Sequence, residues 1–349
     1  MRFALDHDSQ YISAERAYQE SGSAFFCPRC QQTLIIKESK LGRHFFAHRW
    51  PCQARIDQKL DISKDSETEA HRAFKKYYVN YFRQRGFQAE SEHYEASIQQ
   101  FADVWLTLNG QTWIIEYQKS PIPSSILAHR QQAYLSQDNT IYWIMEKKKA
   151  GSTHSQFSKN MIHFDPTLGY YHLCWDERRQ QLFIECLGQN GFIFDQVKPG
   201  LFNLPAIYLC HLSSFTRHNK IKRPVVTKKP TPIYHQRKVQ AILTSQTYRP
   251  YLHDLYQLGI NLAQLPEWIF SAPLPIFIDS PAWLYWTWIA RALQAMDSAT
   301  LIHCLADYLD FLEKKGSLKY ADLPLIRHSV KEALIQATIH YLRDNKIDE

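Results

Sequence analysis

The spacing of apolar residues predicts alternating helices and strands from about residue 61 to residue 150. Residues 66–86 repeat apolar side chains at the helical period, and Ser66 with Glu69 has the spacing of a capping box. Residues 87–98 alternate loosely between polar and apolar side chains, which favours a strand. We therefore expect a helix that begins near Ser66 and is followed by a strand.

The next two apolar runs predict a hairpin. Residues 101–108 and 111–118 are rich in β-branched and aromatic side chains, and the Asn-Gly pair between them favours a tight turn. Residues 124–137 then predict a helix capped by one of its first serines, and residues 140–145 predict a buried strand. The predicted order is helix, three strands, helix, strand, which indicates an α/β core.

Four regions follow one another along the chain. Residues 1–60 hold three cysteines and two closely spaced histidines, and residues 61–150 hold the alternating elements. Residues 151–235 combine short strand-like runs with a basic, proline-containing stretch that is typical of a linker. Residues 236–349 show amphipathic helical spacing in three long segments. We predict a small N-terminal domain, the α/β core, a region of short strands with the linker, and a helical C-terminal domain.

Composition is that of a folded protein, with 45% hydrophobic and 14% aromatic residues. No apolar run approaches the roughly 18 residues of a membrane span, and the charges near the N-terminus argue against a signal peptide. Seven cysteines, an odd number spread over a long chain, do not suggest a disulfide framework. We therefore expect a cytoplasmic protein with reduced thiols.

Positive charge is concentrated in one stretch. The net charge is +7, yet residues 196–253 contain ten Lys and Arg side chains and no Asp or Glu. A local excess of this kind is typical of a segment that binds a polyanion such as DNA. A solvated, flexible linker would have the same composition, and one segment can serve both purposes.

The predicted hairpin carries two acids, Asp103 and Glu116. A carboxylate on a buried strand is costly unless it is paired or bound to a cation. Neighbouring strands could bring both acids to one divalent ion, and two carboxylates with water suit Mg²⁺ or Mn²⁺. Such an ion activates water and neutralises charge at a scissile phosphate. The alternative is a pair of acids at the end of a sheet, bound by Arg or Lys.

The strand with Asp103, the hairpin and the strand with Glu116 resemble the PD-(D/E)xK nuclease superfamily, which is marked by an Asp strand, a hairpin and a Glu-x-Lys strand. The restriction endonuclease-like core of that superfamily has the same order of elements. The resemblance implies that Glu67 is an additional carboxylate ligand and that His71 helps to position the phosphate. Arg130 and Tyr134 are similar to a motif of RecB-like members and would brace the substrate or the metal-binding strands. For Glu67 and His71 the alternative is a solvated helix face.

Gln118 occupies the position where this superfamily usually has lysine. A glutamine carries no positive charge that could orient a hydroxide, so weakened, altered or lost catalysis is expected. Gln118 would instead orient the water or a phosphate oxygen. Lys119 follows directly, but alternation along a strand should place it on the opposite face.

The N-terminal region contains Cys27-x2-Cys30 and, after thirteen residues, His44-x3-His48. This spacing is typical of a tetrahedral Cys2His2 zinc site. We expect His44 and His48 to lie one helical turn apart and the four side chains to hold a structural Zn²⁺, because four protein ligands leave no open position for a substrate. Cys52 could replace one histidine. Buried side chains without a metal are the alternative.

Together these motifs resemble the CoiA family of competence proteins. The CPxC knuckle, HFxAH, a helix with ExxxH, and strands with DV and IEYQ-S occur here in that order, within residues 1–150. The resemblance implies that Gln118 is an ordinary feature of this branch. It also implies a cytoplasmic role in natural transformation, acting on incoming single-stranded DNA at or before recombination, with a recombinase or other competence proteins as partners.

Three functional hypotheses follow. The first is a DNA-binding competence protein with a metal-dependent nuclease site that hydrolyses phosphodiester bonds. The second is a catalytically inactive mediator that binds DNA and assists a recombinase, which the missing lysine favours. The third is a scaffold whose helical half docks a protein partner. DNA binding that weakens with salt separates the first two from the scaffold.

Overall fold

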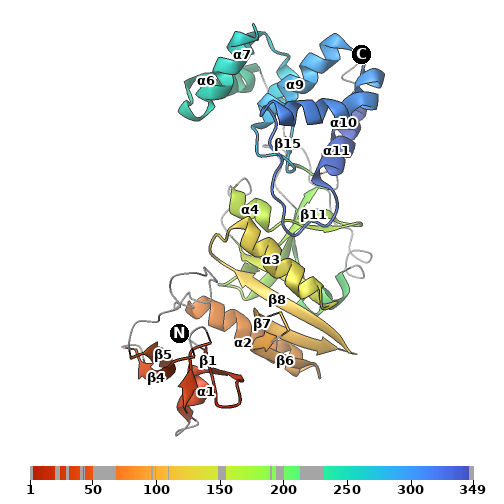
Figure 1. Cartoon of the computed structure of the whole chain (residues 1–349). Helices are drawn as coiled ribbons and strands as arrows, with labels where there is room; N and C mark the ends of the chain where they lie inside the picture. The colour runs from red at the N-terminus through yellow and green to blue at the C-terminus, as the bar shows by residue number, and fades with distance from the viewer. Residues whose placement is uncertain are drawn as a thin grey trace. The chain divides into compact units, whose positions relative to one another are not determined.

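We describe a computed structural model of the chain, which is a mixed α/β protein, as the sequence predicted. It forms two compact units, one of Met1–Ala73 with Tyr94–Phe101 and one of Phe74–His93 with Ala102–Glu349 (Figure 1). The boundaries at residues 60, 150 and 235 stay predictions. The structure describes residues 3–19, 24–28, 31–39, 42, 44–49, 68–95, 97–98, 100–108, 110–147, 155–188, 191–193, 200–212 and 232–345.

The N-terminal unit contains a five-stranded antiparallel sheet in the order β2-β1-β3-β4-β5. A small core lies on one face, where the rings of Phe25 and Phe46 are 5.2 Å apart. Cys27 is buried in the same core. The elements are β1 (Phe3–Leu5), β2 (Tyr11–Ser13), α1 (Ala14–Gln19), β3 (Phe25–Phe26), β4 (Thr33–Glu38) and β5 (His44–His48).

A larger sheet dominates the second unit, with strand order β14-β12-β11-β9-β8-β7-β6 and with β10 paired to β11. The β8–β9 and β9–β11 pairs are parallel, whereas β7–β8 is an antiparallel hairpin. The strands are β6 (Gln88–Glu95), β7 (Gln100–Leu108), β8 (Gln111–Gln118), β9 (Thr140–Glu146), β10 (His163–Asp165), β11 (Gly169–Asp176), β12 (Gln181–Gly188) and β14 (Gly200–Asn203).

Two helices flank the hairpin. Along the chain, α2 (Glu69–Arg83), β6, β7, β8, α3 (Ser124–Leu135) and β9 follow in the predicted order of helix, three strands, helix, strand. Phe74 of α2 stacks on Tyr117 of β8, with ring centroids 4.5 Å apart. The neighbouring residue, Glu116, is instead contacted by α3. Because successive side chains of a strand point to opposite faces, α2 and α3 cover opposite sides of β8.

The structure describes the start of both helices that flank the hairpin. The helix α2 begins at Glu69, and the hydroxyl of Thr68 accepts a hydrogen bond from the His71 N–H at 3.3 Å. Thr68 is thus a cap of α2, and Ser66, the predicted cap, lies outside the described residues. At α3, Pro123 precedes the helix and no side chain caps it, because both serines are already helical.

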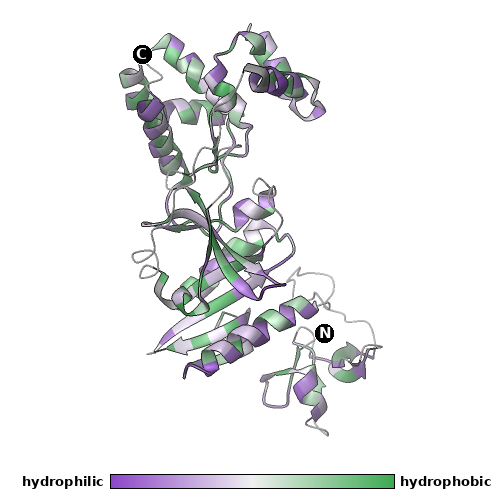
Figure 2. Ribbon diagram, turned by 180° about the vertical axis from the view of Figure 1, so that it is seen from behind, coloured by the Kyte–Doolittle hydropathy of each residue, from purple (hydrophilic) through white to green (hydrophobic). Residues whose placement is uncertain are grey.

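The C-terminal region is mainly helical, and Figure 2 shows hydrophobic and hydrophilic positions alternating along its helices. Its core also includes Ile162, Tyr170 and Leu187 from the sheet side of the unit. The predicted basic linker largely falls on residues 213–231, outside the described part. The elements are α4 (Gln156–Asn160), β13 (Phe192–Ile193), η2 (Ala206–His211), α6 (Pro232–Thr244), η3 (Gln246–Tyr248), α7 (Arg249–Gln257), η4 (Leu262–Gln264), α8 (Glu267–Ser271), β15 (Leu274–Pro275), α9 (Ala282–Ala295), α10 (Ser298–Lys314) and α11 (Val330–Asn345).

Of the helices that the structure describes, none combines the length and the apolar character needed to cross a bilayer.

Candidate functional site

The hairpin brings Asp103 and Glu116 together. Val104 of β7 pairs with Ile115 of β8, so continuing this register by one residue sets Asp103 directly opposite Glu116. Residues that face each other across antiparallel strands share one side of the sheet, with Cβ atoms roughly 5 Å apart. Asp103 Oδ2 also accepts a hydrogen bond from the backbone N–H of Tyr117 at 2.8 Å, which fixes its carboxylate at this end of the hairpin.

Glu116 is buried, with only 4% of its side chain exposed, and α3 supplies its partners. The Tyr134 hydroxyl donates to Glu116 Oε1 at 2.7 Å, and Arg130 Nη2 donates to the same oxygen at 2.8 Å. Arg130 and Tyr134 reach one carboxylate because residues four apart lie on the same side of a helix. These charge-assisted hydrogen bonds offset the cost of burying Glu116.

Arg130 is electrostatically linked to both acids. Burial alone would lower the pKa of its guanidinium, but the nearby Glu116, the Tyr134 phenol and Asp103 raise that pKa above its ordinary value. Burial, followed by the charge of Glu116, likewise raises the pKa of Tyr134, so its phenol stays protonated and donates. The site therefore combines two carboxylates with one permanent positive charge.

Lys119 does not take the place of the missing lysine. Its Nζ donates to Glu177 at 2.7 Å, and the Tyr117 hydroxyl donates to the same oxygen of Glu177 at 2.7 Å. Lys119 and Tyr117 thus share the face of β8 opposite to Glu116 and Gln118, as alternation predicted.

Two protein-family models match the chain, and both concern competence protein CoiA. The N-terminal domain matches residues 8–55, and the nuclease-like domain matches residues 67–190. The chain belongs to the competence protein CoiA family. No curated protein and no solved structure gives a significant match. The CoiA nuclease-like match spans α2 to β12 and so includes Asp103, Glu116 and their partners on α3.

The remaining predicted site residues of this CoiA chain differ in their placement. Gln118 Nε2 donates to the carbonyl of Ser120 at 2.5 Å, so the loop after β8 holds its amide. His71 belongs to the N-terminal unit and Asp103 to the second unit, so a role of His71 at a phosphate stays a prediction. Glu67 lies outside the described residues, and its role as a ligand also stays a prediction.

Sequence reasoning missed a support beneath Arg130. The guanidinium lies over the ring of Trp143, 5.0 Å from the centroid, and Trp143 Nε1 donates to Gln131 Oε1 at 2.7 Å. Gln131 and Trp143 are both buried. In the sequence, the position of Gln131 directly after Arg130 is the only sign of this contact, and it is a weak one.

In the CoiA N-terminal domain, the prediction that His44 and His48 share a helical turn is wrong. Both lie on strand β5, where a spacing of four residues spans about 13 Å rather than the roughly 6 Å of a helix. The roles of His44, His48, Cys27 and Cys30 as zinc ligands stay predictions. His44 also stacks on Tyr18, with ring centroids 3.7 Å apart.

Cys27 lies at the same end of this sheet as His48. Phe25 and His48 both pair with Leu34, so Cys27, two residues after Phe25, points to their side of the sheet. The Cys27 N–H and carbonyl are bonded to Gln32 and Gln31, which closes a tight turn. Within the described ranges no three Cys, His, Asp or Glu side chains converge as metal ligands, and Cys30 and Cys52 lie outside those ranges.

Proposed function

We propose that this CoiA protein binds single-stranded DNA and hydrolyses its phosphodiester bonds at a divalent-cation site formed by Asp103 and Glu116. The main support is the register of the β7–β8 hairpin: continued by one residue beyond the pair Val104↔Ile115, it pairs Asp103 with Glu116. Hard carboxylate oxygens on adjacent strands fit one Mg²⁺ or Mn²⁺ that keeps several water ligands. The match to a nuclease-like domain supports a nucleic acid as the partner.

The protein's own groups would prepare this site for hydrolysis. Arg130 and Tyr134 hold Glu116 in one orientation, and the Tyr117 N–H holds Asp103. Gln118 would orient the attacking water or a phosphate oxygen with its amide. A bound Mg²⁺ or Mn²⁺ would supply Lewis acidity and lower the pKa of water. Membership of the CoiA family supports a role in natural transformation, before or during recombination.

Cleavage of labelled DNA tests this proposal. The substrates are single- and double-stranded DNA with Mn²⁺ or Mg²⁺, and the proteins are the unchanged chain, Asp103→Asn and Glu116→Gln. Glu90→Gln is the matched control, because Glu90 is an exposed carboxylate on the same sheet. Cutting that is lost in the two site variants and kept in the control would support the nuclease. Equal cutting in all four proteins would refute the assignment of the site.

A recombination mediator without nuclease activity is the second candidate. The presence of Gln118 at the usual lysine position and the hydrogen bond from Arg130 to Glu116 favour it. It predicts no cutting, but DNA binding that persists in the Asp103→Asn and Glu116→Gln variants and weakens steeply with salt.

For the N-terminal domain we propose a structural Zn²⁺ site whose ligands include Cys27, Cys30 and one histidine. The strand geometry of β5 favours His48 over His44, because His48 and Cys27 lie at the same end of the sheet. Cys52 then completes four ligands, consistent with the preference of Zn²⁺ for thiolate and imidazole in tetrahedral sites.

A further inference from the structure

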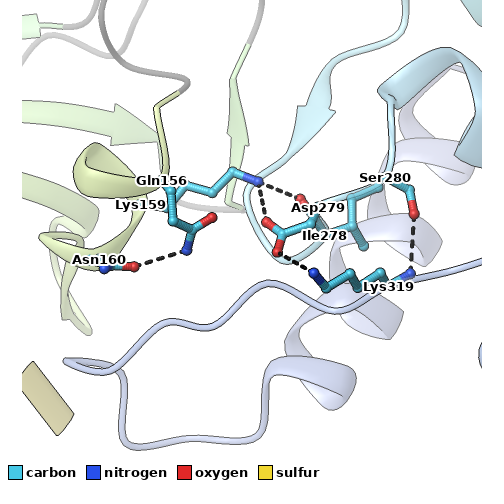
Figure 3. A network of polar contacts seen from close by, with 7 residues as sticks. All are labelled: Gln156, Lys159, Asn160, Ile278, Asp279, Ser280 and Lys319. Carbon is cyan, nitrogen blue, oxygen red and sulfur yellow. Dashed lines mark hydrogen bonds and ion pairs between the residues drawn. The ribbon is translucent and has the colours of Figure 1, made fainter. Parts of the chain in front are cut away.

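A buried lysine on α4 connects the sheet to the helical region. Lys159 is only 9% exposed, and its Nζ donates to the carbonyl of Ile278 at 2.7 Å and to Asp279 Oδ1 at 2.8 Å (Figure 3). Burying an ammonium group is costly unless it is paired and hydrogen-bonded. The two acceptors therefore make this contact specific.

Asp279 is itself fixed within the helical region. Its backbone N–H donates to the carbonyl of Lys319 at 2.8 Å. The Ser280 hydroxyl accepts from the Lys319 N–H at 3.1 Å (Figure 3). The Lys319 ammonium lies 4.0 Å from Asp279 Oδ2, but this side chain is 79% exposed. Asp279 thus has one buried cation from α4 and one solvated cation from its own region.

The residue after Lys159, Asn160, contacts the loop before α3 rather than the helical region. Asn160 is 2% exposed, and its Nδ2 donates to the carbonyl of Ile122 at 3.3 Å. Gln156 Nε2 donates to Asn160 Oδ1 at 2.9 Å, which sets the orientation of the Asn160 amide (Figure 3). Ile122 belongs to the short loop between β8 and α3.

That loop supports the candidate site at both of its ends. The Ser120 carbonyl accepts from Gln118 Nε2, and the Pro123 carbonyl accepts from the N–H groups of Ile126 and Leu127 at the start of α3. The same helix presents Arg130 and Tyr134 to Glu116. A shift of the loop would therefore reach three of the side chains that build the site.

We propose that Lys159 and Asn160 are positioning residues. Lys159 fixes α4 to the helical region, and Asn160 on the same helix holds the loop 119–123 and the start of α3 in place. The C-terminal region then acts as a structural part of the site, although neither family model covers it. The consequence for catalysis rests on the proposed nuclease function, whereas the positioning itself does not.

Hydrogen exchange of the full chain, followed by mass spectrometry, tests the positioning without any cleavage assay. The test variant is Lys159→Met, which keeps an unbranched side chain, one atom shorter than that of lysine, and removes its charge. The matched control is Lys319→Met, the same change at an exposed cation beside the same carboxylate. We expect Lys159→Met to speed exchange about tenfold at residues 119–127 and around residue 279, with no change in the control.

Two further variants keep the test decisive if Lys159→Met folds poorly. Asn160→Ala removes the contact to Ile122 and leaves the ion pair, so it should speed exchange at residues 119–127 alone. In Lys159→Met with Asp279→Asn, the effects of the two changes should not add, because both remove the same pair.

Exchange at residues 119–127 that stays unchanged in both Lys159→Met and Asn160→Ala would overturn the proposal. That outcome does not depend on whether the chain cleaves DNA. A chain that cuts DNA but shows no coupling refutes only the positioning role, and a chain that shows coupling but never cuts refutes only the proposed activity.

Discussion

Glu116 shows at the level of single residues how one carboxylate can serve both folding and chemistry. It is buried on β8, and Arg130 and Tyr134 bond to one of its oxygens. The sequence predicted that these residues belong together, because Arg130 and Tyr134 are one helical turn apart. It could not predict that Glu116 would be the meeting point, since this depends on packing between α3 and β8.

Replacing Arg130 with Met should lower the free energy of unfolding by about 2 kcal/mol, because Glu116 would keep a buried charge without its cationic partner. Adding Glu116→Gln should recover part of this loss. Urea unfolding measures both effects. Arg179→Met is the control, because Arg179 is an exposed arginine 4.0 Å from Asp176. An Arg130→Met chain as stable as this control would contradict the account.

His163 should make stability depend on pH. Burial lowers its pKa from 6.5 to about 4, although its Nε2–H donates to the Trp143 carbonyl. The unfolded state therefore binds the proton first as the pH falls. The neutral, buried His163 contributes fully to the free energy of unfolding above pH 6.5. This contribution is lost as the pH falls towards 4, and about 2 kcal/mol of it is lost between pH 7 and pH 5.

In His163→Gln, the glutamine amide can still donate a hydrogen bond but does not titrate. The urea midpoint of this variant should therefore fall less between pH 7 and pH 5 than that of the unchanged chain. Urea unfolding at the two pH values gives this difference. Identical pH dependence in both proteins would show that His163 does not carry the effect.

At the level of elements, residue type and turn chemistry explain why the hairpin was predictable from the sequence. The two strands are rich in β-branched and aromatic side chains, and Asn-Gly favours a tight turn between strands. The spacing of His44 and His48 was not decisive, because positions four apart share a face in a strand as well as in a helix. The aromatic residues between them fit a strand, and their antiparallel pairing with β4 decides the outcome.

The strand geometry predicts unequal roles for these two histidines. His48→Ala and Cys27→Ala should each lose most of the bound zinc, whereas His44→Ala should retain it, because His44 lies about 13 Å along β5 from His48, at the other end of the strand. Metal analysis of the purified proteins by mass spectrometry measures this. Equal zinc loss in His44→Ala and His48→Ala would instead support the original four-ligand set.

At the level of the whole molecule, the helical region and the sheet share one core. Ile162, Tyr170 and Leu187, which precede the predicted boundary near residue 235, pack in the core of the C-terminal helices. Such contacts join residues far apart in sequence, so periodicity along the chain does not reveal them. Gly191 lies at this junction, and its carbonyl accepts from the Ile276 N–H at 2.9 Å.

Gly191→Ala should therefore destabilise the chain more than Gly316→Ala. Both glycines have positive φ, +67° and +72°, so either alanine adds backbone strain of about 1 kcal/mol. Only at Gly191 would the new Cβ meet Phe277, 2.2 Å from Cζ, which adds about 1–3 kcal/mol of overpacking. Thermal unfolding compares the two variants, and equal losses would contradict a close-packed junction.

The central claim is that Asp103 and Glu116 form one divalent-cation site, and calorimetric titration of the full chain with Mn²⁺ tests it most directly. We expect one site in the unchanged protein and in Glu90→Gln, and at least about a tenfold loss of affinity in both Asp103→Asn and Glu116→Gln, because each loses a carboxylate ligand. Unchanged Mn²⁺ affinity in either of these two variants would contradict the account.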